Sequence, residues 1–171
     1  MSNTSPAVFS DDLRKCAVAV LDAARAGGLK ITTAESCTGG LIAAILTEIP
    51  GSSDVFERGY VTYSNAAKTE CLGVPANMIE LHGAVSREVA QAMADGAASR
   101  ARTDVAIAVT GIAGPGGGTA HKPVGLVHLA IHRKGHLTRH VECRFGDIGR
   151  TAIRLATVRE ALAMLQKAAA S

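Results

Sequence analysis

The chain has 171 residues, of which 47% are apolar, 19% are charged and 3% are aromatic. This composition is typical of one compact globular domain, which at this length buries roughly 70% of the surface exposed by the unfolded chain and needs neither disulfides nor a structural metal. The longest apolar runs fall far short of the ~20 residues of a membrane span, and the start of the chain has no secretory signal. We therefore expect a cytoplasmic protein with no membrane partner.

Charge is unevenly distributed along the chain, whose net charge is +3. Residues 1–121 contain nine Lys and Arg against twelve Asp and Glu, whereas residues 122–171 contain nine against three. The few aromatic residues provide no base-stacking platform, and no nucleic-acid-binding motif is present, so nucleic acid is not an expected partner. The basic surplus favours a small phosphorylated ligand instead.

Cysteine and histidine spacing gives no metal site. The four cysteines are widely spread, with no C-x-x-C pair: Cys16, Cys37, Cys71 and Cys143. Four histidines recur every four residues in a predicted hairpin, where that spacing does not build a helical metal face: His128, His132, His136 and His140. We therefore expect no metal. A Ser-His-Asp triad through His82 remains open, without a G-x-S-x-G motif to support it.

Capping, glycine and apolar patterns predict the following elements in chain order. A disordered tail over residues 1–10 precedes a helix that begins after the N-cap Ser10 and ends before Gly27. Strands are expected over 30–33, 58–63, 104–110, 124–131 and 140–145, the last two as a hairpin around Lys134 and Gly135. Further helices are expected over 41–49, 65–72, 75–81, 86–102 and 150–169.

This alternation of strands and helices predicts one domain over residues 11–169. The fold class is α/β, with three α/β/α layers and a mixed, mostly parallel sheet. Three clusters of polar and glycine residues fall on loops at strand ends, where open α/β sheets usually bind ligands.

The first cluster is the turn from Glu35 to Gly40, between a predicted strand and a predicted helix. Backbone N–H groups and the helix dipole favour negative charge there, so the turn could hold Ser36 as a nucleophile and stabilise the oxyanion that it creates. The same residues also fit a plain N-cap with glycines for a tight turn.

The second cluster runs from Tyr63 to Lys68. A lysine whose pKa is lowered by desolvation can serve as the base for a serine nucleophile, with a tyrosine hydroxyl relaying the proton. The alternative is a solvated lysine on a helix and a packed tyrosine ring.

The third cluster is the glycine-rich stretch from Thr110 to Thr119. Consecutive glycines let backbone N–H groups approach an anion, so a phosphate or carboxylate site is plausible, with a flexible hinge as the alternative. The stretch is neither a P-loop nor a dinucleotide fingerprint, because it leads into a strand.

Six motifs in these regions together resemble the nicotinamide-nucleotide amidohydrolases, the C-terminal domain family of the competence/damage-inducible proteins. They are Ala34 to Gly40, Val61 to Asn65 with Lys68, Leu72 to Val74, His82 to Ser86, Thr110 to Pro115 and Lys122 to Gly125. The resemblance covers Leu13 to Leu165. Because only about ten residues precede the first helix, the chain looks like the stand-alone form of this family.

The resemblance implies deamidation of nicotinamide mononucleotide to nicotinate mononucleotide and ammonia in pyridine-nucleotide salvage, without a metal or redox cofactor. It makes Ser36 the nucleophile, with Tyr63 and Lys68 as its activating partners. We expect the remaining site residues to bind substrate: Glu35, Cys37, Thr38, Gly39, Gly40, Thr110, Gly111, Gly114, Gly117 and Arg150.

The start of the last helix departs from the family's Gly-Asp-Arg signature and reads Gly146 to Arg150, so either Arg150 or Arg154 could reach a phosphate. A homo-oligomer, dimeric or larger, is expected. The competing hypothesis is a non-catalytic module that binds pyridine nucleotides or a partner protein. Such a module would not need Ser36 and Lys68 together.

Overall fold

The computed structural model describes residues 8–171. Most of the expected N-terminal tail therefore lies outside the described residues. Within its last three residues, Phe9 is only 4% exposed and packs into the hydrophobic core. Phe9 therefore contributes to the hydrophobic core, since burial of an aromatic ring stabilises the fold.

Five strands form one mixed sheet in the order β2-β1-β3-β4-β5. Their bounds are β1 (Ile31–Glu35), β2 (Phe56–Val61), β3 (Val105–Gly111), β4 (Leu126–Arg133) and β5 (Arg139–Arg144). β1 pairs in parallel with β2 and β3, whereas β4 is antiparallel to both of its neighbours. Four strands therefore run in one direction, which confirms the predicted sheet and the β4–β5 hairpin.

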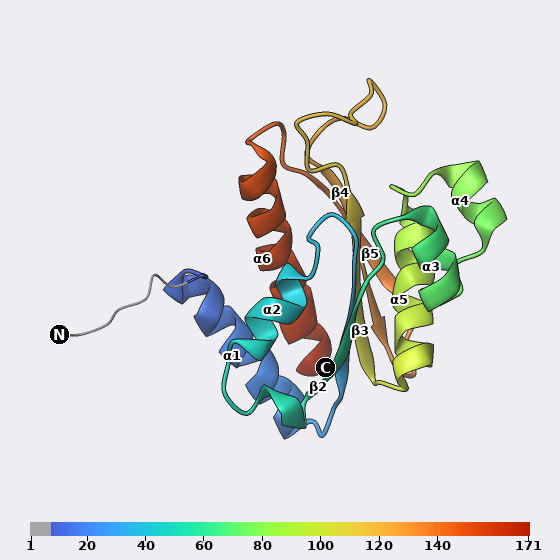
Figure 1. Ribbon diagram of the computed structural model, residues 1–171. Helices are drawn as coiled ribbons and strands as arrows, with labels where there is room; N and C mark the ends of the chain where they lie inside the picture. The colour runs from blue at the N-terminus through green and yellow to red at the C-terminus, as the bar shows by residue number, and fades with distance from the viewer. Residues whose placement is uncertain (1–7) are drawn as a thin grey trace.

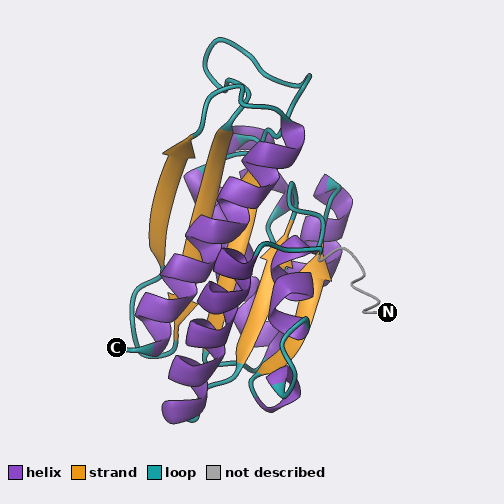
Figure 2. Ribbon diagram, turned by 90° about the vertical axis from the view of Figure 1, so that its left-hand side faces the viewer, coloured by secondary structure: helices purple, strands orange, loops and turns teal. Residues whose placement is uncertain are grey.

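Helices cover both faces of this sheet, which confirms the three-layer α/β/α fold. On one face lie α1 (Asp11–Ala26), α2 (Leu41–Thr47) and α6 (Arg150–Ala169), which are seen in front of the strands in Figure 2. The other face carries α3 (Asn65–Leu72), α4 (Ala76–His82) and α5 (Arg87–Ala101), as Figure 1 shows. None of the helices within residues 8–171 is long and apolar enough to cross a membrane.

The predicted bounds of α1, α3 and α6 are confirmed because local signals define them. In α1 the Ser10 hydroxyl accepts from the Leu13 N–H at 3.4 Å, and the helix ends at Gly27. The apolar face predicted from spacing is fully buried: Leu13, Ala17, Val20, Leu21 and Ala24. In α3 the Ser64 hydroxyl accepts from the Ala67 N–H at 3.0 Å, and Gly73 ends the helix in the left-handed conformation.

The strands lie slightly away from their expected positions, because pairing with neighbours extends or shortens them. β1 continues to Glu35 since its ladder with β2 and β3 continues, and β4 continues to Arg133, which pairs with Val105. β2 ends at Val61, so Tyr63 lies beyond the strand rather than within it. Strand ends thus depend on partners that local sequence does not reveal.

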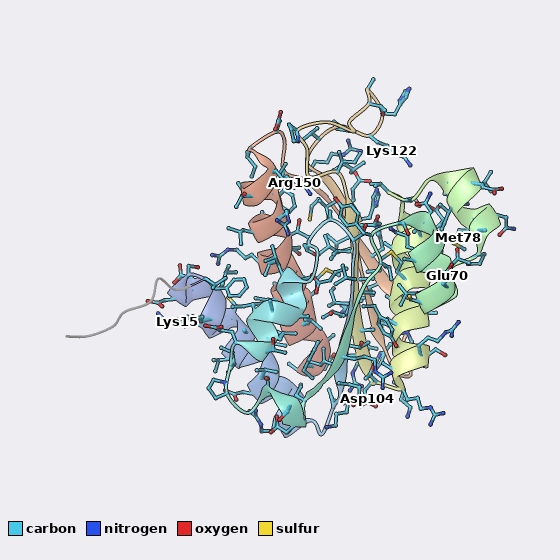
Figure 3. The ribbon with its side chains drawn as sticks, in the orientation of Figure 1. Lys15, Glu70, Met78, Asp104, Lys122 and Arg150 are labelled. Carbon is cyan, nitrogen blue, oxygen red and sulfur yellow. The ribbon has the colours of Figure 1, made fainter. Side chains whose placement is uncertain are left out.

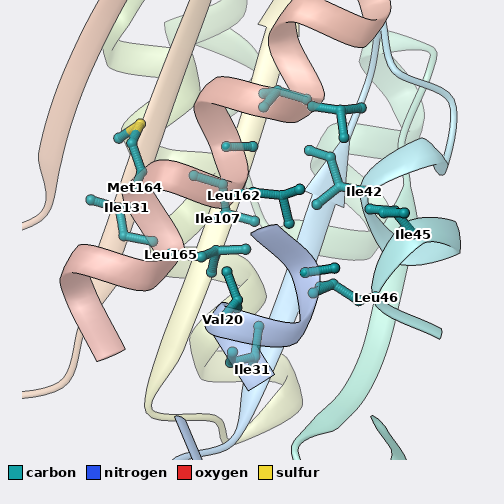
Figure 4. Close-up of a cluster of buried hydrophobic side chains, with 14 of the residues drawn as sticks. Val20, Ile31, Ile42, Ile45, Leu46, Ile107, Ile131, Leu162, Met164 and Leu165 are labelled. Carbon is teal, nitrogen blue, oxygen red and sulfur yellow. The ribbon is translucent and has the colours of Figure 1, made fainter. Parts of the chain in front are cut away.

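Two hydrophobic cores hold the layers together. The larger lies between the sheet and α1, α2 and α6, where Ile107, Leu162 and Ile42 interdigitate (Figure 4). The smaller lies beneath α5 and is rich in alanine. At Gly96 of α5 a Cβ atom would come within 2.0 Å of the Leu72 carbonyl oxygen, so glycine is needed for α3 to sit this close to α5. This contact seats the helix that carries Lys68.

Candidate active site

Ser36 is the first residue after strand β1, which lies between β2 and β3 in the sheet. Its N–H donates to the Val109 carbonyl of β3 at 3.1 Å, and its carbonyl accepts from the Gly39 N–H at 3.0 Å. Gly39 and Gly40 have φ values of 58° and 97°, a left-handed conformation that favours glycine and turns the chain sharply into α2. The serine is thereby held at the end of the sheet, with 8% of its surface exposed.

Glu35 holds this turn from beneath, which differs from the substrate-binding role that we expected for it. Its side chain has no exposed surface, and one carboxylate oxygen accepts from the Thr38 hydroxyl at 2.7 Å. The carboxylate also accepts from three backbone N–H groups at the start of α2: Gly40, Ile42 and Ala43. Glu35 therefore satisfies the free donors of a helix N-terminus that has no side-chain cap.

Arg154 of α6 holds the same turn from the side. Its Nε donates to the Cys37 carbonyl at 3.1 Å and its Nη2 to the Thr38 carbonyl at 3.0 Å. The N–H groups of Gly39 and Gly40 are occupied, as described above. Those of Cys37 and Thr38 donate to no other residue within residues 8–171. Cys37 borders the cavity beside Ser36, so its N–H is available to a ligand, whereas Thr38 has no exposed surface.

Lys68 brings an amine to Ser36 from the opposite layer. Its side chain is 1% exposed, and Nζ lies 3.2 Å from Ser36 Oγ, 2.9 Å from the Thr62 carbonyl and 3.3 Å from the Tyr63 carbonyl. No acid forms an ion pair with it in the described part of the chain. Burial therefore lowers the pKa of the Lys68 ammonium below its usual value.

The neighbours of Nζ suit a neutral amine as well as an ammonium. An ammonium has three N–H donors, and all three surrounding oxygens can accept from it. After one proton is lost, two donors remain for the two carbonyls, and the lone pair then faces Ser36 Oγ. This arrangement fits a general base for the serine hydroxyl.

Titration of Lys68 should therefore be visible in the stability of the protein. The unfolded chain binds the Lys68 proton more tightly than the folded chain, so the free energy of unfolding should increase as pH rises from the lowered folded-state pKa towards about 10.5. Denaturant titrations across this pH range, with the Lys68→Met variant as reference, measure the effect. A difference between the two proteins that does not change with pH would contradict the lowered pKa.

Cys37 is adjacent to Ser36 but is poorly suited to act as a nucleophile. Burial raises the pKa of its thiol to about 11, so the reactive thiolate is scarce at neutral pH. The thiol is 5% exposed and packs into the larger core. The residue can nevertheless contribute its backbone N–H to the site.

A cavity of about 210 Å³ lies beside Ser36 and Lys68. Of the predicted site residues, the structure brings seven together around it: Ser36, Cys37, Tyr63, Lys68, Thr110, Gly111 and Arg150. The others predicted to bind substrate lie outside its lining: Glu35, Thr38, Gly39, Gly40, Gly114 and Gly117. Several of these shape the turn or the glycine-rich loop instead.

Arg150 links three segments at the rim of this cavity. Its Nη1 donates to the Gly114 carbonyl at 2.8 Å and its Nη2 to the Tyr63 hydroxyl at 3.2 Å. Tyr63 is 62% exposed. Figure 3 shows Arg150 at the start of α6, at the end of the sheet where the glycine-rich loop lies. Of the two arginines left open by the sequence, Arg150 therefore lines the cavity and Arg154 holds the serine turn.

Three lining residues were not predicted: Ala84, Val85 and Ala113. Ala84 and Val85 belong to the loop between α4 and α5, and the Ala84 carbonyl accepts from the Thr110 hydroxyl at 2.8 Å. Their motif, His82 to Ser86, was recognised in the sequence, but nothing in its composition indicates contact with Ser36.

The histidines lie away from the Ser36 cavity. His82 is not among its lining residues, and its Nδ1 lies 3.7 Å from the Glu88 carboxylate, so the structure gives no support to a triad through it. His128 and His140 stack on adjacent strands, with Nδ1 and Nε2 2.8 Å apart. Within residues 8–171 no three His, Cys, Asp or Glu side chains gather in a way that could hold a metal ion.

Comparison with solved structures gives close matches to this fold. The crystal structure of a competence/damage-inducible protein from Agrobacterium tumefaciens is 55% identical, with a TM-score of 0.93 over 95% of this chain and 98% of that chain. A competence-damaged protein superfamily member from Escherichia coli is 36% identical, with a TM-score of 0.86 over 95% of each chain.

Sequence comparison leads to the same family. A "CinA-like protein" of Parasynechococcus marenigrum is 52% identical over 158 residues, which cover 92% of this chain and 37% of the relative. Another, from Akkermansia muciniphila, is 61% identical over 111 residues, 65% of this chain and 27% of the relative. The chain thus spans about a third of the length of these relatives. Because the family profile described as the CinA C-terminal domain matches residues 13–169, the chain belongs to the CinA C-terminal domain family.

Proposed function

We propose that the protein is a serine amidohydrolase that deamidates nicotinamide mononucleotide to nicotinate mononucleotide and ammonia. The observation that carries the proposal is the buried Lys68 amine, 3.2 Å from Ser36 Oγ and without an acidic partner in the described part of the chain. The choice of substrate rests on the resemblance of the six sequence motifs.

The first step is attack of Ser36 Oγ on the carboxamide carbon. Neutral Lys68 takes the hydroxyl proton as the new C–O bond forms, and the carbonyl oxygen becomes an oxyanion. The tetrahedral intermediate then breaks its C–N bond, and the proton held by Lys68 passes to the departing nitrogen, which leaves as ammonia. Tyr63 lies at the cavity and could relay this proton.

Hydrolysis of the resulting ester completes the cycle. Lys68, neutral again, takes a proton from water as the water oxygen attacks the acyl carbon. Collapse of this second intermediate breaks the bond to Ser36 Oγ, which regains its proton from Lys68. The carboxylic acid product leaves and loses its proton to solvent.

The N–H group of Cys37, a residue that lines the cavity, is the donor that we assign to the oxyanion. Arg154 is a positioning residue in this scheme. Its guanidinium donates to the carbonyls of Cys37 and Thr38. These two hydrogen bonds fix the turn that contains the Cys37 N–H, so this donor is held in place before substrate binds.

A non-catalytic nucleotide-binding module is the competing function, and ammonia release distinguishes the two. Purified protein incubated with nicotinamide mononucleotide should release one ammonia for each nicotinate mononucleotide formed. The rate should be unchanged by a chelator, since none of the proposed steps uses a metal. Binding of the nucleotide without turnover would favour the module.

The substrate phosphate should contribute strongly to catalysis through Arg150. Binding energy from a remote anionic group also orients the carboxamide towards Ser36, so nicotinamide riboside should have a kcat/KM at least about tenfold lower than the mononucleotide. Arg150→Ala should reduce this preference, whereas Arg159→Ala, an exposed residue farther along the same helix, should keep it. Steady-state rates on both substrates measure the preference. Equal kcat/KM values in the parent protein would contradict a phosphate site.

A further inference from the structure

A second cavity, of about 380 Å³, lies where the β4–β5 hairpin meets the C-terminal part of α6. We name it the distal basic cavity. Its lining contains three basic side chains, Arg133, Arg139 and Lys167, together with His136. Two apolar side chains, Ile131 and Leu137, also line it. Ser171 completes the lining. The basic surplus of residues 122–171 therefore does not gather around Ser36, where Arg150 is its only representative in the lining.

The two cavities lie at opposite ends of the sheet along the strand direction. Ser36 bonds to Val109 near the end of β3, whereas Arg133 pairs with Val105 at the start of β3. Four residues of strand separate these points, which is about 13 Å along the sheet. In Figure 3 Arg150 lies near the first end of the sheet, and Asp104, next to Val105, lies at the opposite end. Among residues 8–171, none lines both cavities.

The three cationic side chains come from separate segments of the chain. Arg133 ends β4, Arg139 begins β5 and Lys167 lies in the last turn of α6. Within residues 8–171 none of them forms an ion pair. One acid, Glu160, lines an adjoining hollow together with Arg139 and Lys167.

Arg133 is held in place by the protein. Its Nε donates to the Ala168 carbonyl at 3.2 Å, while its two Nη groups donate to no atom of the described chain. A guanidinium fixed in this way loses little freedom when an anion binds, and its planar face of N–H donors suits phosphate oxygens. The cavity is also concave and of a size that suits a small molecule rather than an extended polymer.

Cationic side chains that line one cavity repel one another, and a bound anion relieves this repulsion. We propose that the distal basic cavity is a second ligand site, which binds a small metabolite carrying at least two negative charges on phosphate groups. The proposal is independent of the reaction at Ser36, since it rests on residues that the reaction does not use.

Calorimetric titration with inorganic pyrophosphate tests the site. The parent protein is compared with the Arg139→Gln, Lys167→Gln double variant, with Arg150→Gln to remove anion binding at the Ser36 cavity, and with Lys15→Gln, Arg159→Gln as a control. The control also removes two positive charges, but from exposed positions outside both cavities. Thermal unfolding confirms that each variant is folded.

Pyrophosphate should bind the parent, the Arg150 variant and the control with affinities within about twofold, and the Arg139, Lys167 variant at least about tenfold more weakly, since charge-assisted hydrogen bonds are lost. Affinity should also fall as the salt concentration rises. The proposal is overturned if the parent binds no pyrophosphate, if the double variant binds as tightly as the parent, or if Arg150→Gln or the control removes binding.

Discussion

Replacing Ser36 by Ala should abolish ammonia release from nicotinamide mononucleotide, with a loss in kcat on the order of 10³-fold or more. The alanine lacks the oxygen that attacks the carboxamide, and the water left in its place is not held against Lys68. Folding should hardly change, because within residues 8–171 the Ser36 side chain forms a hydrogen bond only with Lys68. An ammonia assay together with thermal unfolding measures both effects.

Cys37→Ala is the matched control for this variant, because it removes the neighbouring side chain and keeps the backbone. Since the thiol is buried and largely protonated, we expect substantial activity and a small loss of stability from the lost packing. If instead Cys37→Ala were inactive and Ser36→Ala active, the nucleophile would be assigned to the wrong residue by one position.

Lys68→Met should remove the chemical step while nucleotide binding persists. Loss of a general base reduces kcat by about 10²- to 10⁴-fold. Methionine fills a similar volume and suits a buried position, so the cavity should retain its shape. Binding of nicotinate mononucleotide, measured by calorimetry, should remain within a few fold of the parent. A variant that no longer binds this product would show that Lys68 acts in binding rather than in proton transfer.

Lys68→Arg distinguishes a base from a mere cation. A guanidinium cannot lose its proton in a protein, so this variant keeps the positive charge but cannot accept the proton of Ser36. We expect it to be as inactive as Lys68→Met. In the parent, kcat/KM should rise with pH through the lowered pKa of Lys68 and then level off, because only the neutral amine acts. Substantial activity in the arginine variant would contradict this role.

Local sequence was sufficient to predict the fold class and several elements. α1 and α3 begin after serine N-caps and end before glycines, as their sequences indicate, and α6 has the predicted bounds. The strand, glycine turn and helix around Ser36 were also predicted, since each depends on residues within a few positions of one another. The position of a possible nucleophile at a strand end therefore follows from the sequence alone.

Tertiary structure decided which of the candidate residues meet. Lys68 reaches Ser36 across 32 positions, and this pairing depends on α3 being seated against α5 at Gly96. Sequence proximity placed Glu35 with the substrate, but its buried carboxylate satisfies the N-terminus of α2.

The fold also separates basic residues that the sequence does not distinguish. Local spacing left Arg150 and Arg154 equivalent, yet one helical turn places the first at the cavity and the second on the serine turn. In the sequence, the basic surplus of the last fifty residues suggested a single site for a phosphorylated ligand. Because β4 runs antiparallel to β3, the C-terminal end of β4 lies at the end of the sheet opposite Ser36. Arg133 therefore lies away from the candidate active site.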